Sequence, residues 1–303
     1  MVVPGLVHVV GNAALDILVR DVEIARTAAA DAWGANVDIL ARPVEAALGG
    51  CGAAPAYVLG RLGTSVVLNA NIGGDAWGRM LAQWLKEVGV ELMAPLDAAT
   101  AAHVIALAPD GRRRSFYYTG PSVDWHRSLA AATPEWLLVS GYGKVAAGDL
   151  AAMRWVCVQM RRRGARVLLD PSPWFAGRVA VEDMQALWEE VDCLSVTQDE
   201  LAAWEEGADC QALAAAVLAR GVAQVAIKRG EQGAYYAERG GACGHVAVAR
   251  VENANTVGAG DSFNGRLVHG LCRGESLAVA VAAAAVVATG VVRGGRGVLG
   301  LTS

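Results

Sequence analysis

The sequence predicts an α/β protein in which a mostly parallel sheet has helices on both faces and carries a small β-sheet lid. Three observations predict this fold class. Apolar runs of β character alternate with helix-like segments along most of the 303 residues. Two segments, at about 17–44 and 100–119, interrupt that alternation. Glycine contributes 36 residues without a regular period, as expected of many tight turns and close backbone approaches.

The main sheet and its helices follow from the alternation. The expected strands are Leu6–Val10, Val66–Ala70, Val104–Leu107, Leu137–Ser140, Arg166–Leu169, Cys193–Val196, Val225–Lys228 and Gly233–Tyr236. The expected helices are Gly52–Gly63, Trp77–Val88, Asp149–Arg163, Asp199–Trp204 and Gln211–Arg220. The Trp77 helix is the best marked, because Asp75 occupies the N-cap position and Gly89 ends the apolar stripe.

The two interruptions predict the lid. Residues 100–119 read as a hairpin that turns at Asp110-Gly111. Residues 17–44 lack a clean helical period, so the two segments could combine into a small second sheet. No linker or internal repeat divides the chain, and residues 1–303 are therefore expected to form one domain with this lid.

The longest apolar run extends from Leu277 to Val292 and ends at Arg293. Its 16 residues, mostly alanine and valine, fall short of the ~20 that a membrane span requires. We therefore expect a buried core helix there. The N-terminus has no basic region and too short an apolar run for a signal peptide. A soluble, cytoplasmic protein is expected.

Composition excludes several function classes. Hydrophobic residues make up 54% of the chain, which excludes a disordered protein. The net charge of −4 means that the chain has no excess of positive charge, so neither a nucleic acid nor an anionic membrane is expected as a partner. The six cysteines contain no CxxC pair and are expected to be buried free thiols in a reducing compartment rather than metal ligands.

The common nucleotide-binding motifs are missing. No GxxxxGK[ST] occurs, and the first strand leads into Gly11-Asn12-Ala13-Ala14 rather than GxGxxG. These absences disfavour a P-loop NTPase and a standard dinucleotide-binding domain.

A glycine-rich stretch near the C-terminus carries the clearest chemical signal. Residues 255–265 read NTVGAGDSFNG and lead into a long apolar segment. Small residues at 258–260 leave backbone amides unshielded at a helix N-terminus, where the amides and the positive end of the helix dipole can bind an anion. Asp261 would lie in the first turn of the same helix, either as a functional carboxylate or as an ordinary helix-favouring one.

The segment Thr256–Phe263 resembles the second signature of the PfkB (ribokinase-like) family of sugar and nucleoside kinases. Four further pieces occur in that family's order: residues 11–16 (GNAALD), residues 49–54 with 73–78 (GGCGAA and GGDAWG), residues 197–200 (TQDE) and residues 228–233 (KRGEQG). The resemblance covers nearly the whole chain and implies the ribokinase-like fold.

The resemblance also implies phosphoryl transfer from ATP, with Mg²⁺, to a hydroxyl group of a small-molecule substrate. Asp261 would be the general base, and the amides of Gly258, Ala259 and Gly260 would stabilise the transferring group. Glu200 would orient Mg²⁺ through water. The implied substrate-binding residues are Asp16, Asn12, Gly49, Gly50, His103 and Arg114. The implied nucleotide-binding residues are Lys228, Gly230, Gly233 and Thr256. The lid would cover the substrate and exclude water, and a homodimer formed through the lid is a further implication.

Alternatives stay open at this point. The acceptor could be a nucleoside, as in the adenosine-kinase-like branch, or the chain could be a non-catalytic ligand-binding protein of the same fold. Glu200 could be an ordinary first-turn helix acid. Lys228 and Arg114 could be merely solvated.

Four departures from the family pattern concern recognition. Ala14 and Ala54 stand where asparagines commonly contact sugar hydroxyls, and Thr197 replaces the asparagine of NxxE. Asn255 replaces an aspartate that helps hold a monovalent cation in some members, so dependence on K⁺ is doubtful. With Ala14 and Ala54 facing the substrate, we expect an acceptor with few hydroxyls or with a flat apolar part, such as a nucleoside base. Lid residues such as His103 or Arg114 could instead supply the missing hydrogen bonds and permit an ordinary sugar.

Overall fold

The computed structural model describes residues 1–22, 37, 39–93, 97–110, 112–141, 147–171, 175–207, 209–252 and 256–301. Its main sheet has nine strands in the order β13-β12-β11-β10-β9-β8-β1-β4-β5. The strands are β1 Val3–Val10, β4 Ser65–Asn69, β5 Val90–Leu92, β8 Pro134–Ser140, β9 Arg166–Asp170, β10 Cys193–Thr197, β11 Gln224–Lys228, β12 Ala234–Glu238 and β13 Cys243–Val246. Neighbouring strands from β11 to β5 are parallel, whereas β12 and β13 pair antiparallel at one edge.

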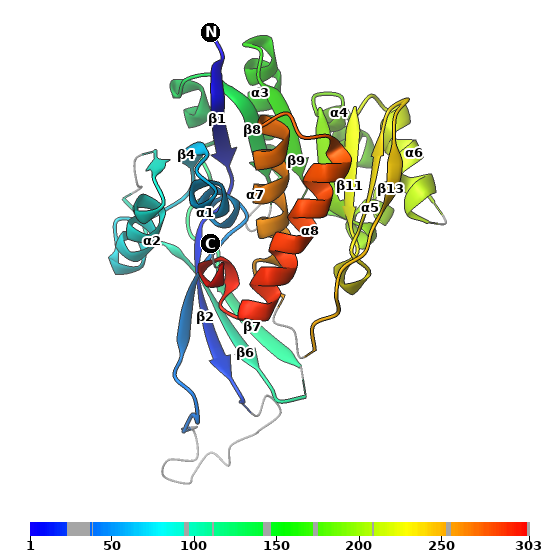
Figure 1. The fold of residues 1–303 in the computed structure, drawn as a ribbon. Coiled ribbons are helices and arrows are strands. Elements are labelled where there is room, and N and C mark those ends of the chain that lie inside the picture. Colours follow the sequence, from blue (N-terminus) through cyan, green and yellow to red (C-terminus); the bar gives the residue numbers. More distant parts are fainter. Residues whose placement is uncertain are drawn as a thin grey trace.

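A second sheet of four strands extends from the lower edge of the main sheet (Figure 1). It has the order β3-β2-β6-β7, with strands β2 Ala14–Arg20, β3 Glu45–Gly49, β6 Ala101–Leu107 and β7 Arg113–Tyr118. Strands β2 and β6 are parallel, and the outer pairs are antiparallel. The predicted fold class is confirmed, and the second sheet is called the lid below. Strands β2 and β3 lie at the two ends of the segment 17–44, most of which lies outside the described residues.

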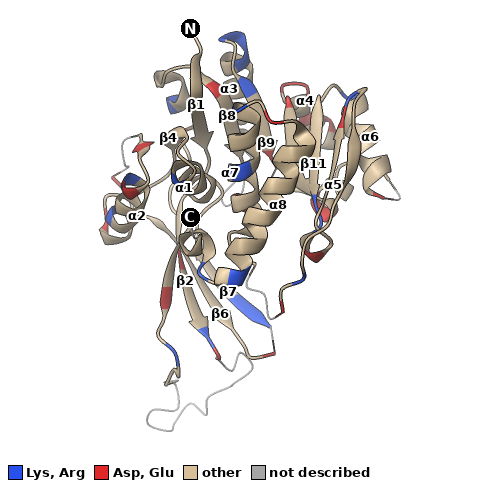
Figure 2. Cartoon of the chain, in the orientation of Figure 1, with Lys and Arg blue, Asp and Glu red and all other residues tan. Residues whose placement is uncertain are grey.

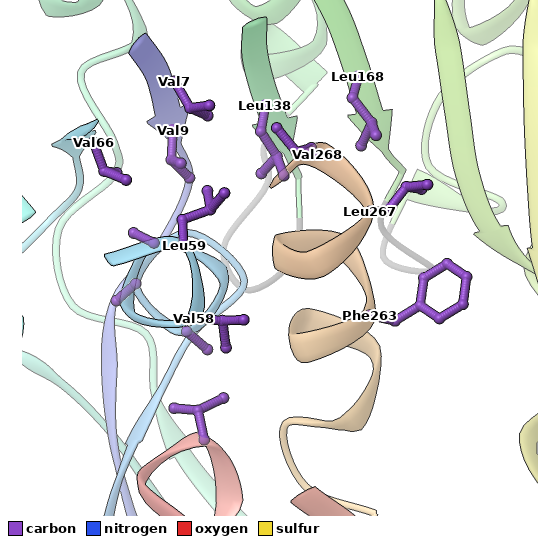
Figure 3. Packing of buried hydrophobic residues seen from close by; sticks show 14 of the residues in the cluster. Val7, Val9, Val58, Leu59, Val66, Leu138, Leu168, Phe263, Leu267 and Val268 are labelled. Atoms are coloured by element: carbon purple, nitrogen blue, oxygen red, sulfur yellow. The ribbon is translucent and has the colours of Figure 1, made fainter. Parts of the chain in front are cut away.

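Helices cover both faces of the main sheet, and each face has its own hydrophobic core. On one face lie α1 Ala53–Arg61, α2 Ala76–Glu87, α7 Ala259–Cys272 and α8 Leu277–Gly294. On the other lie α3 Ala147–Arg162, α4 Val181–Trp188, α5 Gln198–Ala202, α6 Cys210–Ala219 and the short 3₁₀ helix η1 Trp125–Ala130. Figure 3 shows the first core, in which Val268 of α7 lies beside Leu138 of β8 and Leu267 lies toward Leu168 of β9. This packing fixes the position of α7 on the sheet.

The predicted elements are largely present, with shifts of a few residues at their ends. Each of the eight predicted strands and five predicted helices has a counterpart, while β3, β5, β13 and α4 were not predicted. The N-cap at Asp75 is confirmed, because its Oδ1 accepts a hydrogen bond of 2.8 Å from the amide of Gly78. Gly89 follows this helix with a φ of 75°, in the left-handed conformation that favours glycine.

Helix α8 differs from the expected buried core helix. Its buried residues are Leu277, Ala280, Val281, Ala284, Ala285 and Val291, which form one face packed mainly against α7. Val279 and Val286, on the opposite side, are 54% and 71% exposed. By length and composition alone α8 could cross a membrane, and it is the one helix of which this is true among the residues that the structure describes. None of the six cysteines, all of which the structure describes, forms a disulfide; four are buried, but Cys243 is exposed and Cys272 half-buried.

Candidate active site

A cavity of about 530 Å³ lies between the main sheet and the lid. Strands β1, β8, β9, β10 and β11 are parallel, so their carboxyl ends meet at this edge of the sheet, where ligands of α/β proteins usually bind. The cavity is lined by Asn12, Ala14, Asp16, Gly50, Cys51, His103, Arg113, Ser115, Tyr117, Asp170, Thr197, Glu200, Lys228, Thr256, Val257, Gly258, Gly260 and Asp261. Segments far apart in the sequence therefore contribute to one site.

The N-terminus of α7 faces this cavity. Gly258 is the N-cap residue and has φ 78° and ψ 0°, a left-handed conformation that glycine adopts without strain. The first hydrogen bond of the helix runs from the amide of Ser262 to the carbonyl oxygen of Gly258 at 2.9 Å. The amides of Gly260 and Asp261 precede that bond, so they have no acceptor within the helix. Gly258 and Gly260 both line the cavity, which makes this helix end suited to bind an anion.

Asp261 projects from the first turn of α7 beside those amides and is half-buried. Burial, helped by the nearby carboxylate of Asp170 and opposed by Lys228, raises the pKa of Asp261 to about 7. A carboxyl group with this pKa can accept a proton near neutral pH.

Lys228 ends strand β11 and is held by a network that the sequence analysis did not identify. Its Nζ lies 3.2 Å from Oδ2 of Asp170, and the same oxygen accepts a hydrogen bond from Nδ2 of Asn264. Oδ1 of Asn264 in turn accepts a hydrogen bond of 2.6 Å from Ser195. The network joins β9, β10, β11 and α7, so it fixes the Lys228 ammonium relative to the start of the helix.

The Lys228 ammonium also lies close to the anion-binding end of α7. A Cβ atom added to Gly260 would be 3.9 Å from Nζ. Burial lowers the pKa of Lys228, but the carboxylates of Asp170, Glu200 and Asp261 raise it more, so its pKa is above the usual value and it remains a cation. The carboxyl group of Asp170 has its pKa raised to about 6 by burial, against the opposing charge of Lys228.

Glu200 has a structural role that the family resemblance did not include. Its Oε2 accepts a hydrogen bond of 2.8 Å from the amide of Thr197, and the hydroxyl of Thr197 accepts one from the amide of Glu200. This capping box begins helix α5 and holds the Glu200 carboxylate at the cavity wall. Thr197 is thus a competent cap in place of the family's asparagine.

The carboxylates near Lys228 are oxygen ligands of the kind that Mg²⁺ prefers. The part of the chain that the structure describes contains no group of three or more His, Cys, Asp or Glu side chains that could hold a metal. Two of the lining carboxylates, Glu200 and Asp170, fit the usual mode of this ion, in which one or two carboxylates bind it beside phosphate oxygens and water.

Asp16 lies on the lid strand β2 and lines the same cavity as the start of α7. Its Oδ1 is 3.5 Å from Nδ1 of His103 on β6, the directly paired residue. Burial raises the pKa of Asp16, and His103 partly offsets this rise. A Cβ atom on Gly49 would be 2.3 Å from the Asp16 carboxylate, so glycine at 49 leaves room for that group. Gly50, with φ 90°, forms the tight turn that follows.

Asn12 connects the main sheet to the lid. Its Nδ2 donates a hydrogen bond of 2.8 Å to the hydroxyl of Tyr117 on β7. Its Oδ1 accepts hydrogen bonds from the amide and the thiol of Cys51. Because these contacts occupy the Asn12 amide group, Asn12 positions Tyr117 at the cavity wall.

Arg114 does not line the cavity, contrary to the role that the resemblance implied. Alternate residues of a strand face opposite sides, and on β7 the residues that line the cavity are Arg113, Ser115 and Tyr117. The guanidinium of Arg114 instead lies over the exposed ring of Phe116, 5.0 Å from its centroid. The lid arginine at the cavity is therefore Arg113.

Some other predicted positions also lie elsewhere. Ala54 is fully buried in the hydrophobic core of α1, so the expectation that it faces the substrate is wrong, whereas Ala14 does line the cavity. Gly230 and Gly233 lie in the turn after β11 and are not among the lining residues. Ala259 begins α7, and its amide donates to the carbonyl oxygen of Thr256 at 3.2 Å. Asn255 lies outside the described residues.

Comparison with known proteins decides the family. Residues 10–298 match the model of the pfkB family of carbohydrate kinases. The chain belongs to this family. Among curated relatives, fructokinase-2 of Zea mays is 27% identical over 247 residues, which cover 76% of this chain and 72% of that protein. Probable fructokinase-5 of Arabidopsis thaliana is 26% identical over 250 residues, with 76% and 75% covered.

Solved structures of other family members share the fold of this pfkB protein. The Arabidopsis thaliana ribokinase complexed with ribose and ATP has a TM-score of 0.77 at 21% identity, with 100% of this chain and 96% of that chain covered. The nucleoside kinase of Methanocaldococcus jannaschii has a TM-score of 0.75 at 17% identity, with 96% and 93% covered. Sugar and nucleoside kinases thus share this architecture, and the cavity residues must decide the substrate.

Proposed function

We propose that this pfkB protein is an ATP-dependent sugar kinase in which Asp261 is the general base. The observation that carries the proposal is the arrangement of one cavity. Asp261, the open N-terminus of α7 and the Lys228 ammonium line this cavity together with the Asp16 carboxylate of the lid. The fructokinase relatives support a sugar rather than a nucleoside as acceptor.

The acceptor binds between the lid and α7. Asp16 accepts hydrogen bonds from two hydroxyl groups, as an ionised carboxylate can. His103 and Tyr117 add polar contacts from the lid and narrow the range of orientations. The attacking hydroxyl lies beside Asp261, which takes its proton as the new oxygen–phosphorus bond forms.

The γ-phosphoryl group of ATP lies at the start of α7. The amides of Gly260 and Asp261 stabilise its equatorial oxygens, and Lys228 neutralises part of the phosphate charge. Glu200 and Asp170 would hold Mg²⁺ at this wall of the cavity, and the bound ion would supply further neutralisation of the phosphate charge. The four-stranded lid covers the acceptor and excludes water that would otherwise receive the phosphoryl group.

The lid also supports the proposal of a homodimer. Its outer face carries Phe116 and Tyr118, which are 53% and 57% exposed. Large apolar side chains grouped on one face of a small sheet are typical of a surface that pairs with another protein. A second copy of this lid would cover them, and light scattering of the purified protein measures the resulting mass.

An ADP-release screen with ATP and Mg²⁺ tests the proposed activity. The acceptors are neutral pentoses and hexoses, their acids and phosphates, and a nucleoside series, with a no-acceptor control for ATP hydrolysis. We expect ADP release that depends on a sugar-type acceptor and is abolished by EDTA. Release with nucleosides alone would assign the chain to the nucleoside-kinase alternative. Absence of ADP release with every acceptor would favour a non-catalytic ligand-binding protein.

A further inference from the structure

The arginines of the lid differ in whether the guanidinium group has a partner, and the proposed kinase activity does not explain this difference. Four of the five in the described part of the lid have a partner. Arg20 pairs with Glu45, Arg42 with Asp21, Arg112 with Asp110, and Arg114 with the ring of Phe116. The side chain of Arg113 forms no ion pair or hydrogen bond with any described residue, although Arg113 lines the cavity.

Arg113 and the hydroxyl-binding group Asp16 share one face of the lid sheet. Asp16, His103 and Tyr117 lie side by side on neighbouring strands. Arg113 lies four residues before Tyr117 on β7, which places their Cα atoms about 13 Å apart at ~3.4 Å per residue. The long arginine side chain can span part of that distance. The acceptor region thus has a hydroxyl-binding end at Asp16 and a cationic end at Arg113.

The pairing of the two cationic side chains in the cavity favours an anionic ligand at Arg113. Lys228, the other cation in the cavity, is already paired with Asp170 and lies beside the phosphate-binding end of α7. Figure 2 shows the basic start of β7 on the lid, where Arg113 and Arg114 are the first two residues of the strand. A neutral sugar would leave the Arg113 guanidinium without a charged partner, whereas a carboxylate or phosphate would match its fork of donors.

We propose that the acceptor of this kinase carries an anionic group, a carboxylate or a phosphate, which Arg113 binds at the end of the molecule away from the attacking hydroxyl. The acceptor is thus a sugar acid or a sugar phosphate rather than a neutral sugar. This inference rests on the proposed kinase function.

Two neighbouring arginines provide a matched test. Arg113→Gln removes the cation from the cavity face of β7, and Arg114→Gln removes one from the opposite face of the same strand. Both variants and the wild type are assayed by ADP release with fructose 1-phosphate, fructose 6-phosphate and gluconate, each beside its neutral parent sugar. The phosphates and the acid distinguish the two anionic groups.

We expect the preferred anionic acceptor to exceed its neutral parent in kcat/KM by at least tenfold, because a charge-assisted hydrogen bond is commonly worth about that factor or more. Arg113→Gln should remove the preference through a higher KM for the acceptor, with the KM for ATP unchanged, while Arg114→Gln behaves as wild type. A neutral acceptor that is preferred by the wild type, or a raised KM for ATP in Arg113→Gln, overturns the inference but leaves the kinase assignment intact. Absence of ADP release with every acceptor contradicts the kinase function itself, and the inference fails with it.

Discussion

The ammonium group of Lys228 lies 3.2 Å from Oδ2 of Asp170, an oxygen that also accepts a hydrogen bond from Asn264 of α7. The ends of strands β9 and β11 and helix α7 are thereby joined at the Asp170 carboxylate. The relationship makes Asp170 a positioning residue for both Lys228 and Asp261, because its charge stabilises the first as a cation and raises the pKa of the second.

Asp170→Asn should therefore move the pH dependence of kcat. A general base acts only when deprotonated, so activity should fall as the pH drops through about 7, the raised pKa of Asp261. Removing the negative charge at 170 lowers the pKa of Asp261, and the unpaired Lys228 lowers it further, so the acid limb should move to lower pH. Misplacement of Lys228 should also reduce kcat/KM by roughly 10–100-fold.

A kcat profile between pH 5 and pH 9 checks this, with the exposed Asp183→Asn as control. If the acid limb of the kcat profile has the same midpoint in Asp170→Asn as in the wild type, Asp170 does not influence the pKa of Asp261.

Gly260→Val should block phosphate binding without unfolding the protein. A Cβ atom at 260 meets only Nζ of Lys228, at an ordinary 3.9 Å, so the folded chain accommodates it. Its branched side chain would, however, occupy the open end of α7 where the phosphoryl group binds. We expect kcat/KM to fall at least ~100-fold, as when a preorganised donor of the transition state is lost.

The matched control for that variant is Gly290→Val, at an exposed position of α8 where nothing lies within 4 Å of an added Cβ atom. Thermal melting should give similar Tm values for the two variants, because both place valine in a helix. Wild-type turnover in Gly260→Val would contradict a phosphate site at this helix end.

His8 should make the fold sensitive to acid. This side chain is fully buried on β1, neither ring nitrogen has a hydrogen-bond partner among the described residues, and burial lowers its pKa to about 4. The folded state favours the neutral ring, so stability is full above the unfolded pKa of about 6.5 and falls as the pH drops from there to about 4. The two pKa values correspond to a loss of about 3 kcal/mol.

Urea unfolding at pH 7.5 and pH 4.5 measures that loss, with His8→Leu compared with wild type and with the exposed His126→Leu. His8→Leu should lose less free energy of unfolding between the two pH values than either of the others. Equal losses in all three proteins would mean that His8 is not the group responsible.

Local signals in the sequence predicted most of the fold. The Asp75 cap, the strand ends and the start of α7 at residues 256–261 depend on residues close together in the chain, so capping and periodicity suffice to find them. The same is true of Asp261, which is marked by its position after three small residues. The family resemblance supplied the roles of Asp16 and Lys228.

Other parts of the site depend on contacts between distant segments. Arg113 and Arg114 are adjacent, and only the pairing of β7 with β6 determines which of them faces the cavity. The contact of Asn264 with Asp170 joins residues 94 positions apart. The sequence did offer a signal for each of these two residues. Asp170 ends a buried strand, and Asn264 follows Asp261 by nearly one helical turn, so it lies on the same side of the helix. Ala54 was misplaced because its motif position does not reveal that α1 turns it into the core.

The central claim is that Asp261 removes the proton from the attacking hydroxyl, and Asp261→Asn tests it most directly. The substitution keeps the size of the side chain and removes its basicity. Steady-state kcat with the best acceptor should fall by ~10²–10⁴, the usual contribution of a general base. Calorimetric titration should show that ATP binding is largely retained. Turnover near that of the wild type, in a folded variant that binds ATP, would contradict the account.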